Sequence, residues 1–243
     1  WNHTPLLLVS PQAANKTMGQ GGFQEVEQMN LFKDMVCYQE EVRDPSRMAE
    51  VLNRVIEKAI RGSAPAQINV PRDYWTQIID IELPPIVRLE RQGGGADAIS
   101  KAADLLSKAK FPVILSGAGV VIGGAIDETK KLAEKLDSPV CSGYQHNDSF
   151  PGSHPLAVGP LGYNGSKAAM ELISKADVVL ALGTRLNPFS TLPGYGIDYW
   201  PKNANIIQVD INPDRIGLTK KVTVGISGDA KLVAQQIFEK LSS

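Results

Sequence analysis

DVVLALGTRL, residues 177–186, is the stretch that decides the fold of this chain. Residues 178–182 are all apolar, and an uninterrupted apolar run of this length is typical of a strand buried on both faces in a parallel sheet. The run ends at Gly183, and Arg185 follows it. Ligands of open α/β sheets bind at the carboxyl ends of the strands. The stretch therefore predicts a central strand with a ligand site just beyond it.

Strand and helix patterns alternate around this run. Further strands are expected at residues 112–116, 139–142, 206–211 and 223–226, and helices at 98–108, 126–136, 166–176 and 230–241. Residues 143–165 and 187–201 have no periodic pattern, and we expect long irregular segments there. This alternation predicts a doubly wound parallel sheet with helices on both faces.

The first 80 residues contain a smaller α/β pattern. Strands are expected at 6–10, 36–42 and 66–70. A helix is expected to begin at Asp44-Pro45 and to end at Gly62 in a left-handed cap. Because a strand pattern follows soon after Trp1 without any signal-peptide pattern, we expect the chain to be an excised piece of a longer one.

Residues 81–95 separate the two patterns. They contain Pro84-Pro85, mixed charges and three glycines at 93–95, which is typical of an interdomain linker. A surface loop within one domain is the alternative. We therefore expect part of one domain at 1–80, a linker at 81–95 and a second domain at 96–243.

The composition excludes several classes of function. With 25 basic and 26 acidic residues, the net charge is −1, which argues against a nucleic-acid partner, and no apolar run is long enough for a membrane helix. The two cysteines lie far apart, which favours a reducing, cytoplasmic location over a disulfide framework. The three histidines lack metal-ligand spacing, so no metal site is predicted.

Candidate binding residues follow several of the predicted strands. Gly117 and Gly119 resemble half of a dinucleotide fingerprint, with N–H groups facing phosphate or ribose, or they form a tight turn into a helix. Arg185 is suited to a diphosphate, or to an ion pair that holds the 187–201 loop. Asp210 and Asp229 are suited to ribose or adenine, or to capping a helix, and the cap is favoured at Asp229.

Motifs in both halves carry a family resemblance. They are Gly-Gly-Phe-Gln-Glu at 21–25, Asp44-Pro45, Ile-Asn-Val-Pro-Arg-Asp at 68–73, residues 112–119, Leu-Ala-Leu-Gly-Thr-Arg at 180–185 and Val-Asp-Ile-Asn at 209–212. In this order they resemble the pyrimidine-binding and central domains of the thiamine-diphosphate enzymes of the acetolactate synthase group. Residues 1–5, 11–17, 143–148 and 185–196 look more specifically like the sulfoacetaldehyde acetyltransferases of this group.

The resemblance implies an α/β fold in which an incomplete pyrimidine-binding domain precedes a doubly wound, six-stranded parallel sheet. It implies that sulfoacetaldehyde and phosphate become acetyl phosphate and sulfite, with thiamine diphosphate supplying the carbanion chemistry and Mg²⁺ anchoring its diphosphate. The family's cofactor-activating glutamate would precede Trp1, and its Mg²⁺-binding GDG…N segment would follow Ser243. The chain alone is therefore expected to be inactive.

The resemblance also assigns site residues and partners. It implies that Phe23 and Gln24 lie by the active cavity, and that the positions of Gly183, Arg185, Asp210 and Asp229 match flavin contacts in acetolactate synthase. The family's Arg-Phe-Asp-Asp after the glycine is Arg-Leu-Asn-Pro at 185–188, which argues against flavin. A homodimer or homotetramer is expected. The alternatives are a carboligase or acyl-CoA lyase of the group, or a non-catalytic nucleotide-binding module.

Overall fold

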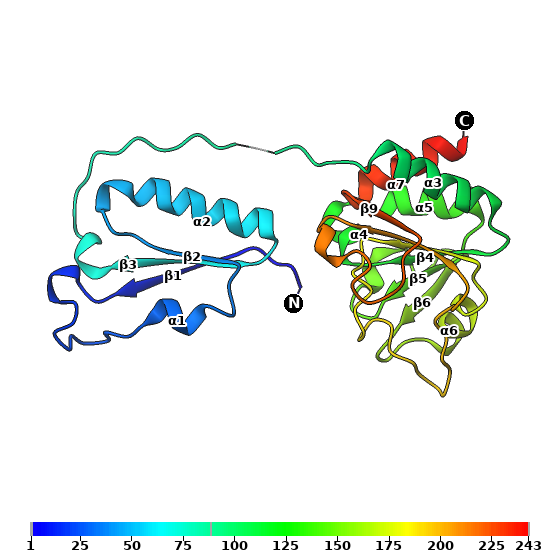
Figure 1. Ribbon diagram of the computed structural model, residues 1–243, viewed down its shortest axis with the longest axis horizontal. Helices are drawn as coiled ribbons and strands as arrows, with labels where there is room; N and C mark the ends of the chain where they lie inside the picture. Colours follow the sequence, from blue (N-terminus) through cyan, green and yellow to red (C-terminus); the bar gives the residue numbers. More distant parts are fainter. Residues whose placement is uncertain (1, 88, 243) are drawn as a thin grey trace. The chain divides into compact units, whose positions relative to one another are not determined.

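The computed structural model describes residues 2–87 and 89–242 and divides the chain into two compact units, with the boundary in the sequence between residues 88 and 89 (Figure 1). Each unit has its own sheet, and we describe each by itself. No helix within the described ranges is both long and apolar enough to cross a membrane.

The first unit contains a three-stranded parallel sheet in the order β1-β3-β2. Its strands are β1 (Leu6–Gln12), β2 (Tyr38–Glu41) and β3 (Pro65–Pro71). Helix α2 (Met48–Gly62) lies on one face of the sheet and the short α1 (Gln28–Phe32) on the other (Figure 1). Alternate residues of β3 explain this arrangement, because its apolar side chains pack with α2 while Gln67 and Asn69 are buried and hydrogen-bonded to other polar side chains.

The helical segment begins at Asp44-Pro45 as predicted, but as a 3₁₀ turn that precedes α2, and α2 ends differently from the prediction. The carboxylate of Asp44 accepts the Ser46 N–H at 2.8 Å, and a 3₁₀ turn (Pro45–Arg47) leads into the helix. The left-handed cap is Ser63, with φ of 46°, so the prediction of this conformation for Gly62 was wrong. A Cβ on Gly62 would lie 3.1 Å from the Cys37 sulfur, so close packing explains the glycine instead.

The second unit confirms the predicted doubly wound sheet. It has six parallel strands in the order β6-β5-β4-β7-β8-β9. They are β4 (Pro112–Ser116), β5 (Val140–Gly143), β6 (Ala157–Leu161), β7 (Val178–Leu182), β8 (Asn205–Asp210) and β9 (Val224–Ser227). Numbered within the unit, this order is 3-2-1-4-5-6, the arrangement of dinucleotide-binding folds.

Helices cover the two faces of this sheet unequally. Helices α3 (Ala96–Lys108), α4 (Ala118–Gly123), α5 (Ile126–Leu136) and α7 (Ala230–Ser242) contribute to the core on one face. Helix α6 (Lys167–Ile173) lies on the other face, together with buried Leu186 and Tyr199 (Figure 1). The crossovers from β7 to β8 and from β8 to β9 contain no α-helix, so irregular backbone covers that part of the sheet.

Strand β6 corrects the prediction of an irregular segment at 143–165. It pairs only with β5 and forms an edge of the sheet. Gly159 and Pro160 interrupt its apolar pattern, and proline is tolerated at sheet edges because no second neighbour needs its missing N–H. These residues hide the strand from a search for apolar periodicity.

The last residues of the predicted linker pack against the second unit. A guanidinium nitrogen of Arg91 lies 3.3 Å from an Asp229 carboxylate oxygen, and the Asp229 N–H donates to the Gln92 carbonyl at 2.8 Å. The Gly94 N–H donates to the Gln236 side chain at 3.0 Å. Residues 91–94 therefore belong to the packed surface of this unit.

Candidate functional site

The strand order of the second sheet reverses between β4 and β7. Strands β5 and β6 extend the sheet on one side of β4, and β7, β8 and β9 extend it on the other. In open α/β sheets the crevice at such a switch point, at the carboxyl ends of the strands, is where ligands bind. The predicted residues Gly117, Gly119 and Gly183 lie here.

These three glycines bring two loop backbones into direct contact. The N–H of Gly117 donates to the Leu182 carbonyl at 3.1 Å, and that of Gly119 to the Gly183 carbonyl at 2.8 Å. A Cβ on Gly119 would lie 2.7 Å from the Gly183 Cα, and one on Gly117 would lie 2.6 Å from the Gly183 oxygen. The two N–H groups therefore bind backbone carbonyls rather than facing a ligand, and the glycines serve close approach.

Three charged side chains gather at the carboxyl ends of β7 and β8. Burial lowers the pKa of Arg185, and the positive charge of Arg215 lowers it further, whereas Asp210 opposes this shift. Burial raises the pKa of Asp210 although Asn212 and both arginines favour its charged form. The Asn212 N–H donates to this carboxylate at 2.9 Å. The structure thus brings the predicted Arg185 and Asp210 together and adds Arg215, which the sequence analysis missed.

Gln208 is a second residue that the sequence analysis missed. Its side-chain nitrogen donates to the carbonyls of Thr184 and Arg215, each at 3.2 Å, and its oxygen accepts the Gly217 N–H at 2.9 Å. Only 1% of Gln208 is exposed. Gln208 is a polar residue between the apolar residues of β8, and this was the available sequence signal for a buried polar role. Its hydrogen-bond partners could not be predicted, because they lie on two separate loops.

Asp229 plays a different part from Asp210. One of its carboxylate oxygens accepts the N–H groups of Lys231 and Leu232 at the start of α7, at 3.0 and 3.2 Å. The other lies 3.3 Å from Arg91, and the residue is 5% exposed. These contacts are those of a helix N-cap.

An aromatic cluster occupies the other half of the same sheet edge. Tyr144 follows β5, Tyr163 follows β6, and Phe189 lies in the loop after β7, with ring centroids 5.1–6.2 Å apart. The Tyr163 N–H donates to the Phe189 carbonyl at 3.1 Å, which joins the two loops. The sequence analysis assigned none of these rings, because they come from three separate segments.

In the first unit, Phe23 and Gln24 lie in an exposed turn near the end of β1. Gln12 at the end of β1 donates to the Val26 carbonyl at 3.1 Å, which holds the segment there. Phe23 is 82% exposed, and Gln24 has a left-handed φ of 62°. The carboxylate of Glu25 accepts the N–H groups of Gly19 and Gly22 and fixes the glycine turn.

Comparison with known proteins identifies the family. Residues 99–237 match the family described as "Thiamine pyrophosphate enzyme, central domain". The chain belongs to this family.

Two relatives match over the whole chain. One, named "Probable sulfoacetaldehyde acetyltransferase", is from Rhizobium meliloti (strain 1021), and it is 81% identical over 100% of this chain and 41% of its own length. The other, named "Sulfoacetaldehyde acetyltransferase", is from Roseovarius nubinhibens, and it is 79% identical over 100% of this chain and 40% of its own length. The chain therefore spans about two fifths of the length of these relatives.

A solved structure supports the fold. The crystal structure of benzoylformate decarboxylase from Polynucleobacter necessarius aligns with a TM-score of 0.81 and 22% identity, covering 99% of this chain and 45% of that one. At this identity the likeness shows the fold alone.

The family name implies a bound thiamine pyrophosphate. The Mg²⁺ ion expected with this cofactor needs a cluster of oxygen ligands. Among residues 2–87 and 89–242, no group of three or more His, Cys, Asp and Glu side chains is placed to hold a metal ion. The described residues therefore do not fit a Mg²⁺ site, and we derive no step through the metal.

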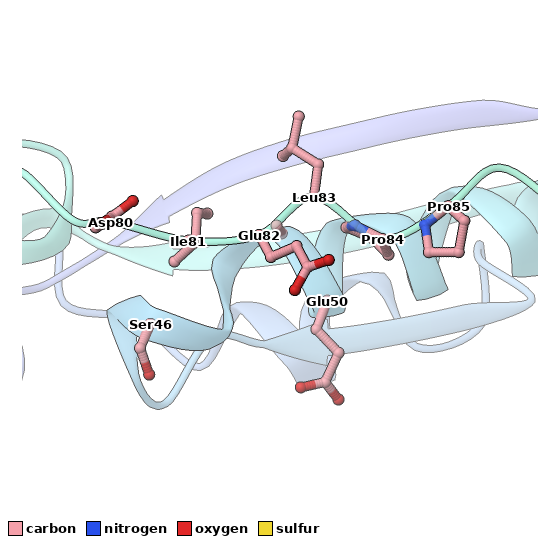
Figure 2. Close-up of a pocket in the computed structure, with 9 residues that line it drawn as sticks. Ser46, Glu50, Asp80, Ile81, Glu82, Leu83, Pro84 and Pro85 are labelled. Atoms are coloured by element: carbon pink, nitrogen blue, oxygen red, sulfur yellow. The ribbon is translucent and has the colours of Figure 1, made fainter.

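A cavity of about 550 Å³ lies in the first unit between the start of α2 and residues 80–85 (Figure 2). Its wall includes Glu50, where hydrogen bonds from Arg47 and then Arg54 lower the pKa to about 2. Leu83, 76% exposed, points away from α2 in this view. The Glu50 carboxylate is already paired with arginines and the cavity is open on one side, so it does not have the features of an active site. None of the predicted site residues lines it.

Proposed function

We propose that this chain is part of a sulfoacetaldehyde acetyltransferase, which converts sulfoacetaldehyde and phosphate into acetyl phosphate and sulfite. The observation that carries the proposal is 79–81% identity over the whole chain with two proteins bearing this name. Tyr144, Tyr163 and the loop at 187–201 lie within the matched region, so the similarity extends to the proposed ligand edge of the sheet. We propose a cytoplasmic location and a homodimer or homotetramer.

Phe23 and Gln24 are proposed to line the cavity that holds thiamine diphosphate. When bound, this cofactor supplies a carbanion for attack on the carbonyl substrate. An 82% exposed aromatic ring beside a left-handed glutamine supports this role, because such backbone costs on the order of 1–3 kcal/mol and collects at functional sites. The Mg²⁺ ligands are proposed to come from parts of the relatives that this chain does not span.

The switch point of the second sheet is proposed to bind a ligand of its own. Gly117, Gly119 and Gly183 bring the two loops into close contact, and Arg185 and Asp210 lie at the adjoining strand ends. Asp229 belongs to the same predicted set, and its geometry supports capping α7 instead. The Arg-Leu-Asn-Pro sequence at 185–188 favours a ligand other than flavin.

Domains at 1–80 and 96–243 with a linker at 81–95 are also proposed, the last residues of this linker being packed against the second domain, and proteolysis tests these limits. Glu82 is exposed and outside any helix or strand, so protease Glu-C should cut the native protein there. The bond after Arg91 should resist trypsin, because Arg91 and Gln92 are held by Asp229. Protection at Glu82 would contradict the linker.

The decisive assay uses the full-length protein that carries this sequence. With thiamine diphosphate and Mg²⁺, it should form acetyl phosphate and sulfite from sulfoacetaldehyde and phosphate. The 243-residue chain should not, because a cofactor relay needs placement within about half an ångström and the family's glutamate is not in this sequence. A yellow, flavin-containing protein that joins two pyruvates instead would assign the carboligase activity.

A further inference from the structure

A hydrogen-bonded turn carries Phe23 and Gln24. The Glu25 N–H donates to the Gly22 carbonyl at 3.1 Å, so Phe23 and Gln24 are the central pair of a four-residue turn. Gln24 is the third residue of this turn and has a left-handed φ of 62°. Turns with a positive φ at this position usually have Gly or Asn there, because a Cβ disfavours this conformation. The backbone at Gln24 therefore needs support from neighbouring groups.

The side chain of Glu25 gives this support. One carboxylate oxygen accepts the Gly22 N–H at 3.0 Å, and the other accepts the Gly19 N–H at 2.6 Å. Gly19 and Gly21 have left-handed φ angles of 81° and 71°, and glycine loses more conformational freedom on folding than any other residue. Hydrogen bonds to an ionised acceptor are among the strong ones. The carboxylate thus ties together a segment that contains three left-handed residues, Gly19, Gly21 and Gln24.

Hydrogen bonds, rather than buried side chains, determine the shape of this segment. The structure describes every residue from 14 to 37, and none of them is buried. The Gln20 N–H donates to the Thr17 carbonyl at 3.1 Å, which orders the chain before the turn. Gln12 holds the Val26 carbonyl, which lies after the turn. Of these contacts, those of Glu25 are the ones that act on the turn itself.

We propose that Glu25 is a positioning residue that holds Gln24 in place for its role beside thiamine diphosphate. The inference rests on the proposed function, in which Gln24 lines the cofactor cavity. Glu25 acts through the turn rather than on the cofactor, because both of its carboxylate oxygens already accept backbone N–H groups. A site residue must be placed within about half an ångström, so release of the turn should remove Gln24 from its productive position.

Glu25→Ala tests the contacts of the carboxylate, and Glu27→Ala is the matched control. Glu27 is exposed and its side chain makes no capping hydrogen bond with α1, so its substitution removes the same charge without altering the turn. Hydrogen exchange of the full-length protein is followed from milliseconds to seconds in peptides that include Gly19 and Gly22. We expect exchange about 10- to 100-fold faster in Glu25→Ala and unchanged exchange in the control. Equal exchange in the two variants would overturn the proposal.

Turnover of the full-length enzyme separates positioning from a purely structural role. Glu25→Ala should lower kcat by up to about 100-fold, since a misplacement of about 1 Å can cost this much. If Glu25 acts through Gln24, adding Glu25→Ala to Gln24→Ala should lower kcat little further. A purely structural loss would lower kcat by the same factor in both backgrounds, and this result would refute the positioning role.

Glu25→Gln is the conservative variant. Its side chain keeps one acceptor oxygen for one of the two glycine N–H groups. We therefore expect exchange and kcat between those of Glu25→Ala and the unsubstituted protein. A kcat no higher than that of Glu25→Ala would count against the role of these hydrogen bonds.

The two readouts separate this inference from the proposed function. Acetyl phosphate formation by the unsubstituted protein, with equal exchange or multiplied losses in the variants, would refute the positioning role alone. Faster exchange in Glu25→Ala, in a protein that joins two pyruvates and forms no acetyl phosphate, would refute the acetyltransferase alone, and the kcat comparison would then use the pyruvate reaction. A full-length protein with neither activity would refute both.

Discussion

Replacing Gly119 with alanine should destabilise the second unit by about 2 kcal/mol. The new Cβ would lie 2.7 Å from the Gly183 Cα, whereas carbon atoms pack best at about 3.5–4.0 Å, so the two loops must separate by roughly 1 Å. Forced overpacking costs about 1–3 kcal/mol. The 2.8 Å hydrogen bond between Gly119 N–H and Gly183 O would lengthen, at about 1 kcal/mol. Alanine recovers about 0.5–1 kcal/mol of helix propensity in α4.

Gly123→Ala is the matched control for this substitution. Gly123 lies in the same short helix, and its Cβ would be 3.4 Å from an Asp229 oxygen, which is ordinary contact. It keeps the gain in helix propensity without the clash, so we expect no loss of stability or a gain below about 1 kcal/mol.

Hydrogen–deuterium exchange of peptides from β4 and β7 measures the stability of this unit alone. A loss of 2 kcal/mol should speed exchange of the slowest amides about 30-fold in Gly119→Ala. Gly123→Ala should match the unsubstituted protein. Equal exchange in the two variants would refute the close backbone contact between the loops after β4 and β7.

Three further predictions concern other residues. In the full-length enzyme, Gln24→Ala should lower turnover on the order of 10²-fold with an unchanged melting temperature, and unchanged kinetics at saturating cofactor would remove this residue from the site. Asp229→Ala should cost about 1–2 kcal/mol of stability and expose Arg91 to trypsin, whereas Asp229→Asn should retain the cap; a loss of ligand affinity at unchanged stability would instead favour a cofactor contact. Burial raises the pKa of Cys141 to about 12, so only Cys37 should be alkylated in the native protein at pH 8. Because the unfolded thiol titrates near 8.5, Cys141 should also make stability fall as pH rises from about 9 toward 12, and a Cys141→Ala variant should lack this contribution.

The fold of the second unit was largely predictable because its central strands are apolar and unbroken. Residues 178–182 coincide with β7, and residues 126–136 with α5. Burial on both faces leaves a strong signal in the sequence. Strand β6 lies at an edge and contains a glycine and a proline, so its own residues do not predict a strand. Its strand conformation depends on pairing with β5.

The positions of candidate residues were predictable where residues directly follow strands, because topology alone puts them at one edge. Gly117, Gly183, Arg185 and Asp210 lie at this edge as predicted, and their binding roles stay predictions. Gln208 was not predicted, since its importance depends on carbonyl groups from two loops that approach only in the folded unit. Likewise, the glycine at the end of α2 is explained by its close packing against Cys37, and the left-handed residue is Ser63, which a preference for glycine at helix ends does not predict.

The sequence Arg-Leu-Asn-Pro after the glycine has a structural explanation that bears on the ligand. Leu186 is fully buried with a left-handed φ of 53°, and its carbonyl accepts the Thr219 hydroxyl at 2.6 Å. The Asn187 side chain accepts the Ser190 N–H and donates to the Ser190 hydroxyl, each at 3.0 Å. Both side chains therefore build the turn and have little capacity to contact a bound molecule. If this edge binds a ligand as proposed, we expect recognition to rest on the side chains of Arg185 and Asp210 rather than on residues 186 and 187.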